Sequence, residues 1–135
     1  MEDRNRTGHE TARRYAAAEM TGIDRERLLL LLLEGGGRFL RLAREGLVGG
    51  DVAAFCQALA RAQAIIAELQ GTLDHQAGGE IAANLHRLYD FMLFHLTEAN
   101  AQRSVRHLDE VIATYDTVTD AFRQVLEPGR VSLDG

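Results

Sequence analysis

The chain has 135 residues, a formal net charge of -5 at pH 7, 46% hydrophobic residues, 6% aromatic residues and one proline. At this length it forms one domain, and a composition rich in Ala and Leu favours packed helices over a sheet. The acidic balance argues against nucleic acid or an anionic membrane surface as a partner. The single cysteine, Cys56, allows no internal disulfide and fits a reducing compartment.

The N-terminal region carries no pattern that is typical of a targeting signal. Residues 1–10 are charged and polar, and they lack the apolar region of a secretory signal. The longest uninterrupted apolar run, Leu28–Leu33, is far shorter than the roughly 20 residues that cross a bilayer. We therefore expect a soluble, cytoplasmic protein with no membrane insertion.

The first two predicted elements are a polar tail and a short helix. The composition of residues 1–10 predicts a disordered N-terminal tail. Residues 11–20 predict a short helix whose one large side chain is Tyr15. A helix of this length is stable only when it packs against a larger body, so we expect it to dock on the rest of the domain.

The first long helix is predicted to have Asp24 as its N-cap and to run to about Val48. Its apolar residues cover an arc of about 200°, roughly twice the width of a normal core stripe. We assign one face of this arc to the core: Leu29, Leu33, Gly36, Leu40, Ala43 and Leu47. The adjoining second face carries Leu28, Leu31, Leu32, Phe39 and Leu42, with Gly35 and Gly46 between the two faces.

Three consecutive glycines, Gly35–Gly37, lie inside this wide arc. In a helix interior each glycine costs about 1 kcal/mol relative to alanine, so their presence needs a reason. One interpretation is a kinked helix or a close crossing with another helix. The other is that the missing side chains open a groove for the backbone of a partner, and the sequence leaves both open.

The second long helix follows a turn at Gly49 and Gly50, and Asp51 is its predicted N-cap. It is expected to end at about Leu73. Its predicted core stripe consists of Phe55, Leu59, Ala62, Ile66, Leu69 and Leu73, and Ile65 lies toward the edge of that stripe.

The third long helix is predicted over Gly78–Asn100, after a turn at His75–Ala77. Its core stripe is predicted to contain Ile81, Leu85, Leu88, Tyr89, Met92, Leu96 and Ala99. Phe94 falls on the far side of the same helical wheel and Phe91 at its flank. Since a soluble helix gains nothing by exposing two phenylalanines to water, we expect these two side chains to have a partner outside the core.

The fourth long helix is predicted to be capped by Ser104 and stopped by Pro128 and Gly129. Its core stripe is predicted to contain Leu108, Val111, Ile112, Tyr115, Val118, Phe122, Val125 and Leu126. Four long helices joined by short turns predict an all-α protein, an antiparallel four-helix bundle with the short N-terminal helix packed on it. We expect one domain over residues 11–127 and a flexible tail over residues 128–135.

The residues that usually carry catalytic or metal chemistry are not arranged for it. No two of the five histidines are four residues apart, no Glu-x-x-His occurs, and one cysteine cannot build a zinc site. Nucleophile-elbow and Walker-type glycine patterns are also absent. His86 could be the phosphoacceptor of a histidine phosphotransfer module, but Arg87-Leu88-Tyr89-Asp90 lacks the pattern that follows such histidines. We expect no enzymatic activity, no cofactor and no metal.

An ordered set of segments resembles the flagellar export chaperone family, FliS. Arg61–Leu69, followed by Leu73-Asp74, resembles the family segment "KAQ-x-II-x-EL…LD". The match continues through Gly78–Ala82, Asn84-Leu85, Leu88–Met92, Leu96 and Glu98–Asn100, and extends roughly from Tyr15 to Leu126. The chain departs from the family at Asp24-Arg25 in place of Ser-Pro, at Leu32–Gly35 in place of "LYDG", at Gly36-Gly37, and at Phe122 in place of a tryptophan.

The resemblance implies a small helical bundle that binds the disordered C-terminal segment of flagellin in the cytoplasm. Such a chaperone prevents premature polymerisation and helps present flagellin to the gate of the flagellar type III export apparatus. Together with the unassigned apolar surface, it implies these client-binding residues: Tyr15, Leu28, Leu31, Gly35, Phe39, Leu42, Ile65, Phe91 and Phe94. Tyr15 is expected to act as a competing lid. A homodimer with a self-complementary apolar surface, formed without client, stays open as an alternative.

Overall fold

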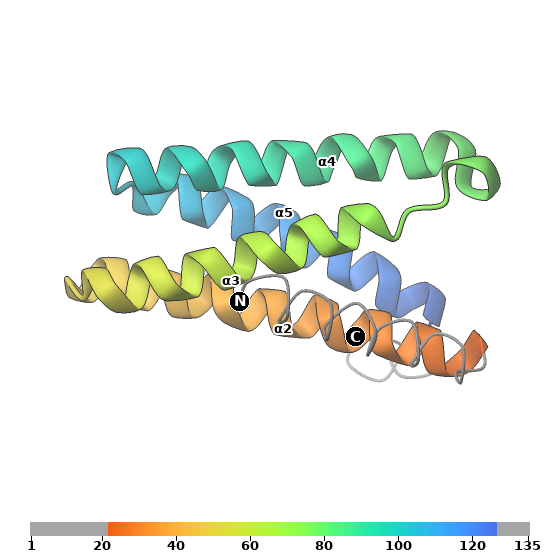
Figure 1. Cartoon of the computed structure of the whole chain (residues 1–135), viewed down its shortest axis with the longest axis horizontal. Coiled ribbons are helices and arrows are strands. Elements are labelled where there is room, and N and C mark those ends of the chain that lie inside the picture. Colours follow the sequence, from red (N-terminus) through yellow and green to blue (C-terminus); the bar gives the residue numbers. More distant parts are fainter. Residues whose placement is uncertain (1–21, 127–135) are drawn as a thin grey trace, which may run out of the picture.

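The computed structural model describes residues 22–126, which form four α-helices and contain no strand. The helices in chain order are α2 (Gly22–Gly49), α3 (Val52–Gly71), α4 (His75–Gln102) and α5 (Val105–Leu126). They lie lengthwise beside one another (Figure 1). The predicted all-α helical bundle is confirmed. The predicted N-terminal tail, the short helix with Tyr15 and the C-terminal tail lie outside the described residues.

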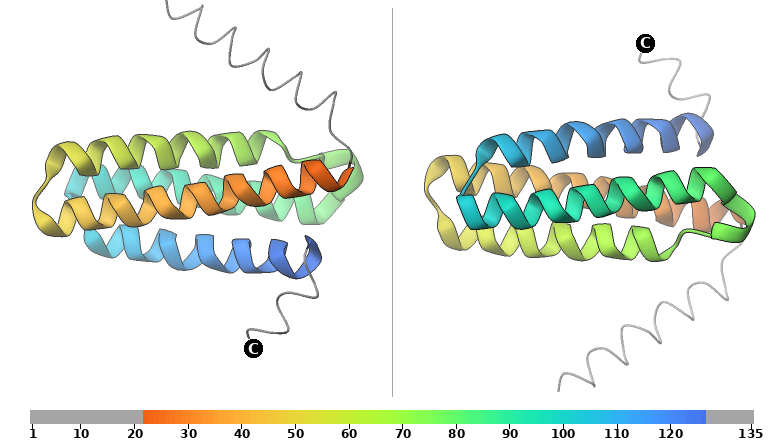
Figure 2. Two further views of the ribbon diagram at one scale, coloured as in Figure 1. Left: turned by 90° about the horizontal axis from the view of Figure 1, so that it is seen from below. Right: turned by 90° about the horizontal axis from the view of Figure 1, so that it is seen from above.

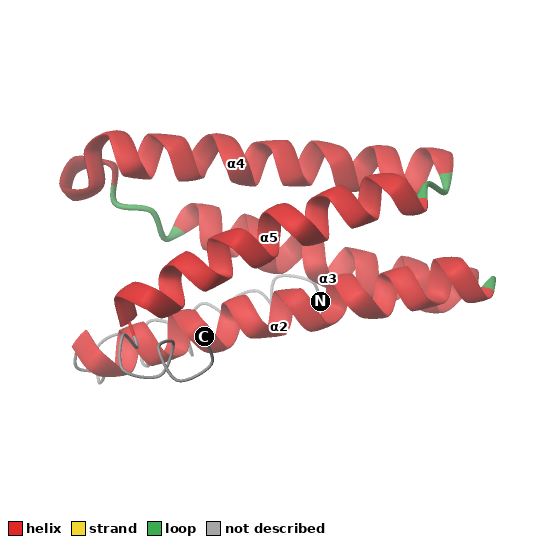
Figure 3. Ribbon diagram, turned by 180° about the vertical axis from the view of Figure 1, so that it is seen from behind, coloured by secondary structure: helices red, strands yellow, loops and turns green. Residues whose placement is uncertain are grey.

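The four helices form a closed arrangement in which α2 and α4 are diagonally opposite. α2 packs against α3 and α5, and α4 packs against the same two helices. Residues 50–51 join α2 to α3, and residues 103–104 join α4 to α5 at the same end of the bundle (Figure 2). Figure 3 shows the third connection, residues 72–74, at the opposite end. Connections this short force consecutive helices to be antiparallel neighbours.

Polar side chains cap three of the helix starts. The Asp51 carboxylate accepts a hydrogen bond from the Ala54 backbone N at 3.0 Å, and the Ser104 hydroxyl accepts one from the His107 backbone N at 3.2 Å. Both predicted caps are therefore confirmed. Asp74 caps α4 in the same way, by accepting from the backbone N of residues 76 and 77 at 3.1 and 3.0 Å. Each such cap contributes about 1 kcal/mol.

Two predicted helix starts are wrong. α2 already includes Gly22, so Asp24 lies within its first turn, where the carboxylate faces the positive end of the helix dipole. α4 begins at His75, directly after its cap, so residues 75–77 are helical and do not form a turn. The glycine signal instead marks a break inside the helix, because Gly79 has φ 52° and ψ -123°, a conformation that favours glycine.

The core is formed mainly by the predicted stripes. The predicted core residues that are buried are Leu33, Leu40, Ala43, Phe55, Leu59, Ala62, Ile66, Leu69, Tyr89, Met92, Leu96, Ala99, Leu108, Val111, Tyr115 and Val118. Predicted core residues that are half-buried and pack against this core are Leu29, Leu47, Leu73, Leu85, Ile112, Phe122 and Leu126. Leu30 and Ala82 are also buried, although the stripes did not include them.

Three predicted core residues are exposed: Ile81 (72%), Leu88 (38%) and Val125 (77%). Ile81 lies near the start of α4 and Val125 near the end of α5, at the end of the bundle where these two helices diverge (Figure 1). Leu88 lies at the edge of the α4 stripe. A helical wheel gives the direction of a side chain but not how far along the helix a packing partner extends, so it overestimates the core at helix ends and edges.

The three glycines of α2 lie in an unbroken helix, so the kink interpretation is wrong. The Tyr115 hydroxyl of α5 donates a hydrogen bond to the Leu33 carbonyl at 2.6 Å. A Cβ at Gly36 would clash with that hydroxyl and lie 2.9 Å from Tyr115 Cζ. At this position the glycine therefore allows a close crossing of two helices, which was one of the predicted explanations, and does not open a groove for a partner.

The two core tyrosines predict a loss of stability at high pH. Burial raises the pKa of Tyr89 to about 12, and burial raises the pKa of Tyr115 as well. An unfolded tyrosine loses its proton near pH 10, whereas the buried one keeps it. The contribution of these tyrosines to the free energy of unfolding is therefore constant below about pH 10 and falls by about 1.4 kcal/mol per pH unit per tyrosine as the pH rises from 10 toward 12.

All fifteen basic residues are arginines, so no lysine titrates in this pH range and the slope reports on the tyrosines. Urea unfolding between about pH 9 and pH 12 measures it. Tyr89→Phe is expected to flatten the slope because phenylalanine carries no titrating proton. A slope that the substitution leaves unchanged would contradict the assignment to Tyr89.

Candidate functional site

A groove lies between α2 and α3, beside the turn that joins them. Its volume is about 440 Å³, and it is lined by Phe39, Leu42, Glu45, Gly46, Asp51, Ala54, Gln57, Ala58 and Arg61. α2 and α3 approach very closely here, since a Cβ at Gly46 would lie 2.7 Å from the Phe55 backbone N. The lining of the groove therefore combines apolar Phe39, Leu42 and alanines with charged side chains.

An apolar strip continues from this groove along α2. Leu28, Leu31, Gly35, Phe39 and Leu42 follow one another at intervals of three or four residues, so they lie on one face of the helix. At a rise of 1.5 Å per residue, the strip is about 21 Å long. Leu31 is 55% exposed and Leu42 is 48% exposed, although both are leucines. At its leucines, the strip is thus an apolar surface that the described helices leave uncovered.

Ile65 extends this strip onto α3. Gly35 is buried, and a Cβ added to it would lie at an ordinary 3.8 Å from the Ile65 Cδ1. Ile65 itself is half-buried and packs against the core. We call the groove, the five α2 residues and Ile65 together the α2–α3 surface.

A second apolar feature lies on α4. Phe94 is 62% exposed, as expected, and Phe91 is exposed to a smaller degree. The Phe91 and His95 rings are 4.0 Å apart between centroids, and the His95 Nε2 lies 3.4 Å from a Glu110 carboxylate oxygen of α5. Phe91 therefore lies on the side of α4 that borders α5, and Phe94, three positions later, is more exposed to solvent.

The structure brings together six of the nine predicted client-binding residues on the α2–α3 surface. Phe91 and Phe94 are separate from them, because α4 is diagonally opposite α2 in the bundle. Tyr15 lies outside the described residues. One partner could contact both surfaces only by passing around the bundle, which a segment that orders on binding can do.

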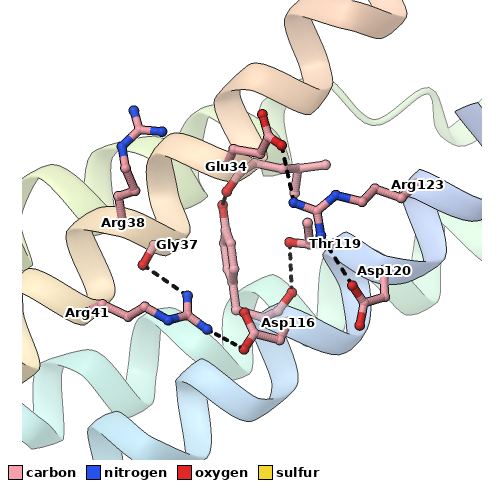
Figure 4. Close-up of a pocket in the computed structure, with 10 residues that line it drawn as sticks. Glu34, Gly37, Arg38, Arg41, Asp116, Thr119, Asp120 and Arg123 are labelled. Carbon is pink, nitrogen blue, oxygen red and sulfur yellow. Dashed lines mark hydrogen bonds and ion pairs between the residues drawn. The ribbon is translucent and has the colours of Figure 1, made fainter. Parts of the chain in front are cut away.

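A second hollow, which is polar, lies between α2 and α5. Its volume is about 560 Å³. In Figure 4 its charged side chains other than Arg38 pair with one another: Arg41 lies 2.6 Å from Asp116, and Arg123 lies 3.2 Å from Glu34. Arg44 pairs with Asp109 along the same seam at 2.5 Å, which raises the pKa of the guanidinium. These charges satisfy one another across the two helices.

Sequence reasoning missed the charged residues beside the α2–α3 surface. The Arg61 guanidinium lies 5.5 Å from the centroid of the Phe39 ring. Arg38 approaches the same stretch, since its Nη2 would lie 3.8 Å from a Cβ at Gly35. Glu45 lines the groove near the turn. A search for charged residues that flank the wide apolar arc would have found Arg38 and Glu45, but Arg61 needs the register between the two helices.

The histidines and the cysteine form no metal site within residues 22–126, where no group of three or more His, Cys, Asp and Glu side chains could hold an ion. Cys56 is exposed on α3. His86 is half-buried, with its Nε2 3.5 Å from an Asp90 carboxylate oxygen. The features that stand out on the described helices are therefore apolar surfaces, which usually mark sites that bind other molecules.

Among the described helices, α3 alone is long and apolar enough to cross a membrane, judged by length and composition. The search for uninterrupted apolar runs missed this because Arg61 and Glu68 interrupt the helix. Six α3 residues, including Phe55, Leu59 and Ile66, are buried in the bundle. Core helices of soluble proteins have the same composition, and α3 packs as one of them.

Comparison with known proteins agrees with this picture of a binding surface on a helical bundle. The family model for flagellar protein FliS matches residues 8–128. The flagellar secretion chaperone FliS of Salmonella typhimurium is 37% identical over 99 residues, which are 73% of this chain and 73% of that protein. FliSB of Pseudomonas aeruginosa is 36% identical over 96 residues, 71% of this chain and 76% of that protein.

FliS of Bacillus subtilis is 32% identical over 108 residues, which are 80% of each chain. The similarity thus extends over most of the chain in relatives from several bacteria, and the matched range includes all four described helices. The family consists of chaperones and not of enzymes. The chain belongs to the FliS family of flagellar secretion chaperones.

Proposed function

We propose that this chaperone binds the disordered C-terminal segment of flagellin in the cytoplasm. Binding prevents premature polymerisation and delivers flagellin to the gate of the flagellar type III export apparatus. The observation that carries this proposal is the α2–α3 surface, where an apolar strip about 21 Å long stays uncovered by the described helices. A large exposed apolar patch on a soluble protein usually marks a binding surface.

The shape of the α2–α3 surface fits an amphipathic helix. Leu28, Leu31, Gly35, Phe39 and Leu42 have the spacing that presents side chains to a helix lying alongside. The groove at one end can hold a few apolar side chains of the client. A disordered client segment that folds as it binds loses conformational entropy. Burial of the exposed leucines would offset that loss.

Phe91 and Phe94 on α4 are proposed to hold a second part of the same client segment. Since they lie on the other side of the bundle, the segment would continue around it after leaving the α2–α3 surface. Tyr15 is proposed to occupy part of the client surface when no client is bound. Flagellin would then have to displace it.

Replacing Phe94 by Asp is expected to weaken client binding about tenfold while leaving the melting temperature nearly unchanged. The side chain is 62% exposed, so it contributes little to the core but offers apolar area to a partner. Titration calorimetry and thermal unfolding measure the two effects. Val125→Asp is the matched control, because Val125 is also exposed but lies outside the proposed surface. A large loss of stability would instead place Phe94 in the core.

A filament-growth assay tests the proposed function as a whole. Purified flagellin should stop adding to filament seeds when the chaperone is present in equimolar amounts. Flagellin that lacks its C-terminal segment should no longer bind the chaperone. Seeded growth that continues unchanged with excess chaperone would contradict the proposal.

A further inference from the structure

Across three of the four seams between the described helices, charged side chains have a polar partner on the neighbouring helix. Arg41, Arg44 and Arg123 pair across α2 and α5, Gln70 bonds Asp90 across α3 and α4, and His95 faces Glu110 across α4 and α5. The α2–α3 surface differs: Arg38, Glu45 and Arg61 have no ion-pair partner within residues 22–126. Three charges without an ion-pair partner among the described residues thus border the α2–α3 surface.

The positions of these charges follow from the register of the two helices. Gly36 lies against Ile65 and Gly46 against Phe55, so α2 and α3 run antiparallel with these residues side by side. In that register Arg38 and Arg61 are offset by about two residues along the helix axes, which corresponds to about 3 Å. Glu45 lies five to seven residues nearer the turn, or about 7 to 10 Å further along.

Both arginines turn toward the apolar strip. The Arg61 guanidinium lies over the Phe39 ring, and Arg38 lies close to Gly35. Figure 4 shows Arg38 pointing away from the ion pairs of Arg41 and Arg123, although it lines the same polar hollow. At the other end of the groove, Asp51 adds a second carboxylate beside Glu45. The α2–α3 surface is therefore basic near Phe39 and acidic at the turn.

We propose that these charges fix the direction in which the client segment lies on the α2–α3 surface. An acidic side chain of the bound helix lies between Arg38 and Arg61, and a basic side chain five to seven positions away faces Glu45. The occupant is thus an amphipathic helix whose apolar face is flanked by an acidic side chain toward one end and a basic side chain toward the other. This inference rests on the proposed function, since it concerns the same client at the same surface.

Pairing of these charges is expected to determine the orientation of the bound helix more than its affinity. An exposed guanidinium is well hydrated, but a docked apolar helix would remove water from Arg61 and leave its charge unpaired unless the client supplies a carboxylate. Arginine binds a carboxylate through two parallel hydrogen bonds, which adds geometric specificity. A segment bound in the reverse direction would bring like charges together at both ends, which disfavours that orientation.

Charge-reversal variants of the chaperone test this inference. The probe is a synthetic peptide with the sequence of the C-terminal flagellin segment from the same genome, and fluorescence anisotropy measures its affinity. Arg61→Glu, Arg38→Glu and Glu45→Arg are each expected to lower the affinity roughly five- to tenfold. Arg106→Glu is the control: it makes the same charge change as the arginine variants, on a side chain of α5 that is 86% exposed.

Charge rescue then determines the direction. Each acidic residue of the peptide is replaced by lysine in turn. At one position, we expect the lysine peptide to bind the wild-type chaperone more weakly and the Arg61→Glu chaperone as well as the original peptide binds the wild type. Glutamate at one basic position should restore binding to Glu45→Arg, and the order of the two positions gives the direction of the helix. If the charge-reversal variants bind the peptide as well as Arg106→Glu does, or if no peptide position rescues binding, this inference is wrong but the proposed function stands. A wild type that does not bind the peptide would overturn the proposed function with it.

Discussion

Replacing Gly36 by alanine is expected to lower the free energy of unfolding by about 3 kcal/mol, while the same change at Gly35 raises it by up to about 1 kcal/mol. The added methyl group at Gly36 would meet the Tyr115 ring and lie 3.0 Å from the Ile65 Cγ2. Tyr115 cannot move away cheaply, because it is buried and its hydroxyl bonds the Leu33 carbonyl. Overpacking and a broken buried hydrogen bond together exceed the gain in helix propensity.

Gly35→Ala is the matched control, since the nearest atoms to its added Cβ are at 3.8 Å. Urea unfolding of the two single variants measures the difference in sign. Adding Tyr115→Phe to Gly36→Ala should recover part of the lost stability, because it removes the hydroxyl that clashes. If Gly36→Ala is as stable as the wild type, then the close packing of Tyr115 on α2 is wrong.

Replacing both Leu31 and Leu42 by Asp is expected to weaken client binding about 100-fold. Both leucines are about half exposed, so each loses roughly 1 kcal/mol of apolar burial on binding, and a carboxylate on an apolar interface adds to that loss. A total of about 3 kcal/mol corresponds to about two orders of magnitude in the dissociation constant. Each substitution should cost less than about 1 kcal/mol of stability, because neither residue is in the core.

Fluorescence anisotropy with a labelled flagellin peptide measures this loss, and thermal unfolding checks that the fold is intact. The control is the Ile81→Asp, Val125→Asp double variant, which changes two exposed apolar residues at another place on the bundle. If the two double variants bind the peptide with equal affinity, the α2–α3 surface is not part of the client-binding site. Sedimentation equilibrium on the same proteins tests the alternative: a dimer that persists with saturating peptide and is lost in the Leu31→Asp, Leu42→Asp variant would favour self-association.

Much of the fold could be predicted because helical periodicity and cap residues are local signals. The stripes that contain Phe55 and Leu108 are buried as predicted, and Asp51 and Ser104 cap their helices. The exposure of Phe94 was also predictable, since one helix cannot bury two opposite faces. These inferences need only the residues of a single helix.

What could not be predicted depends on how two helices meet. Gly36 is required by Tyr115, which is 79 positions later in the chain, and nothing local to either residue indicates that contact. The position of Arg61 over Phe39 likewise follows only from the register of α3 on α2. The exposure of Ile81 depends on where the neighbouring helices end, and a wheel drawn for one helix does not contain that information.

Titration calorimetry of the C-terminal flagellin segment at several temperatures tests the central claim most directly. We predict saturable binding with a large negative heat-capacity change, because an apolar strip and a folding client are removed from water together. The heat-capacity change should be much smaller for the Leu31→Asp, Leu42→Asp variant. No detectable binding, or a heat-capacity change near zero in the wild type, would contradict binding of flagellin through the α2–α3 surface.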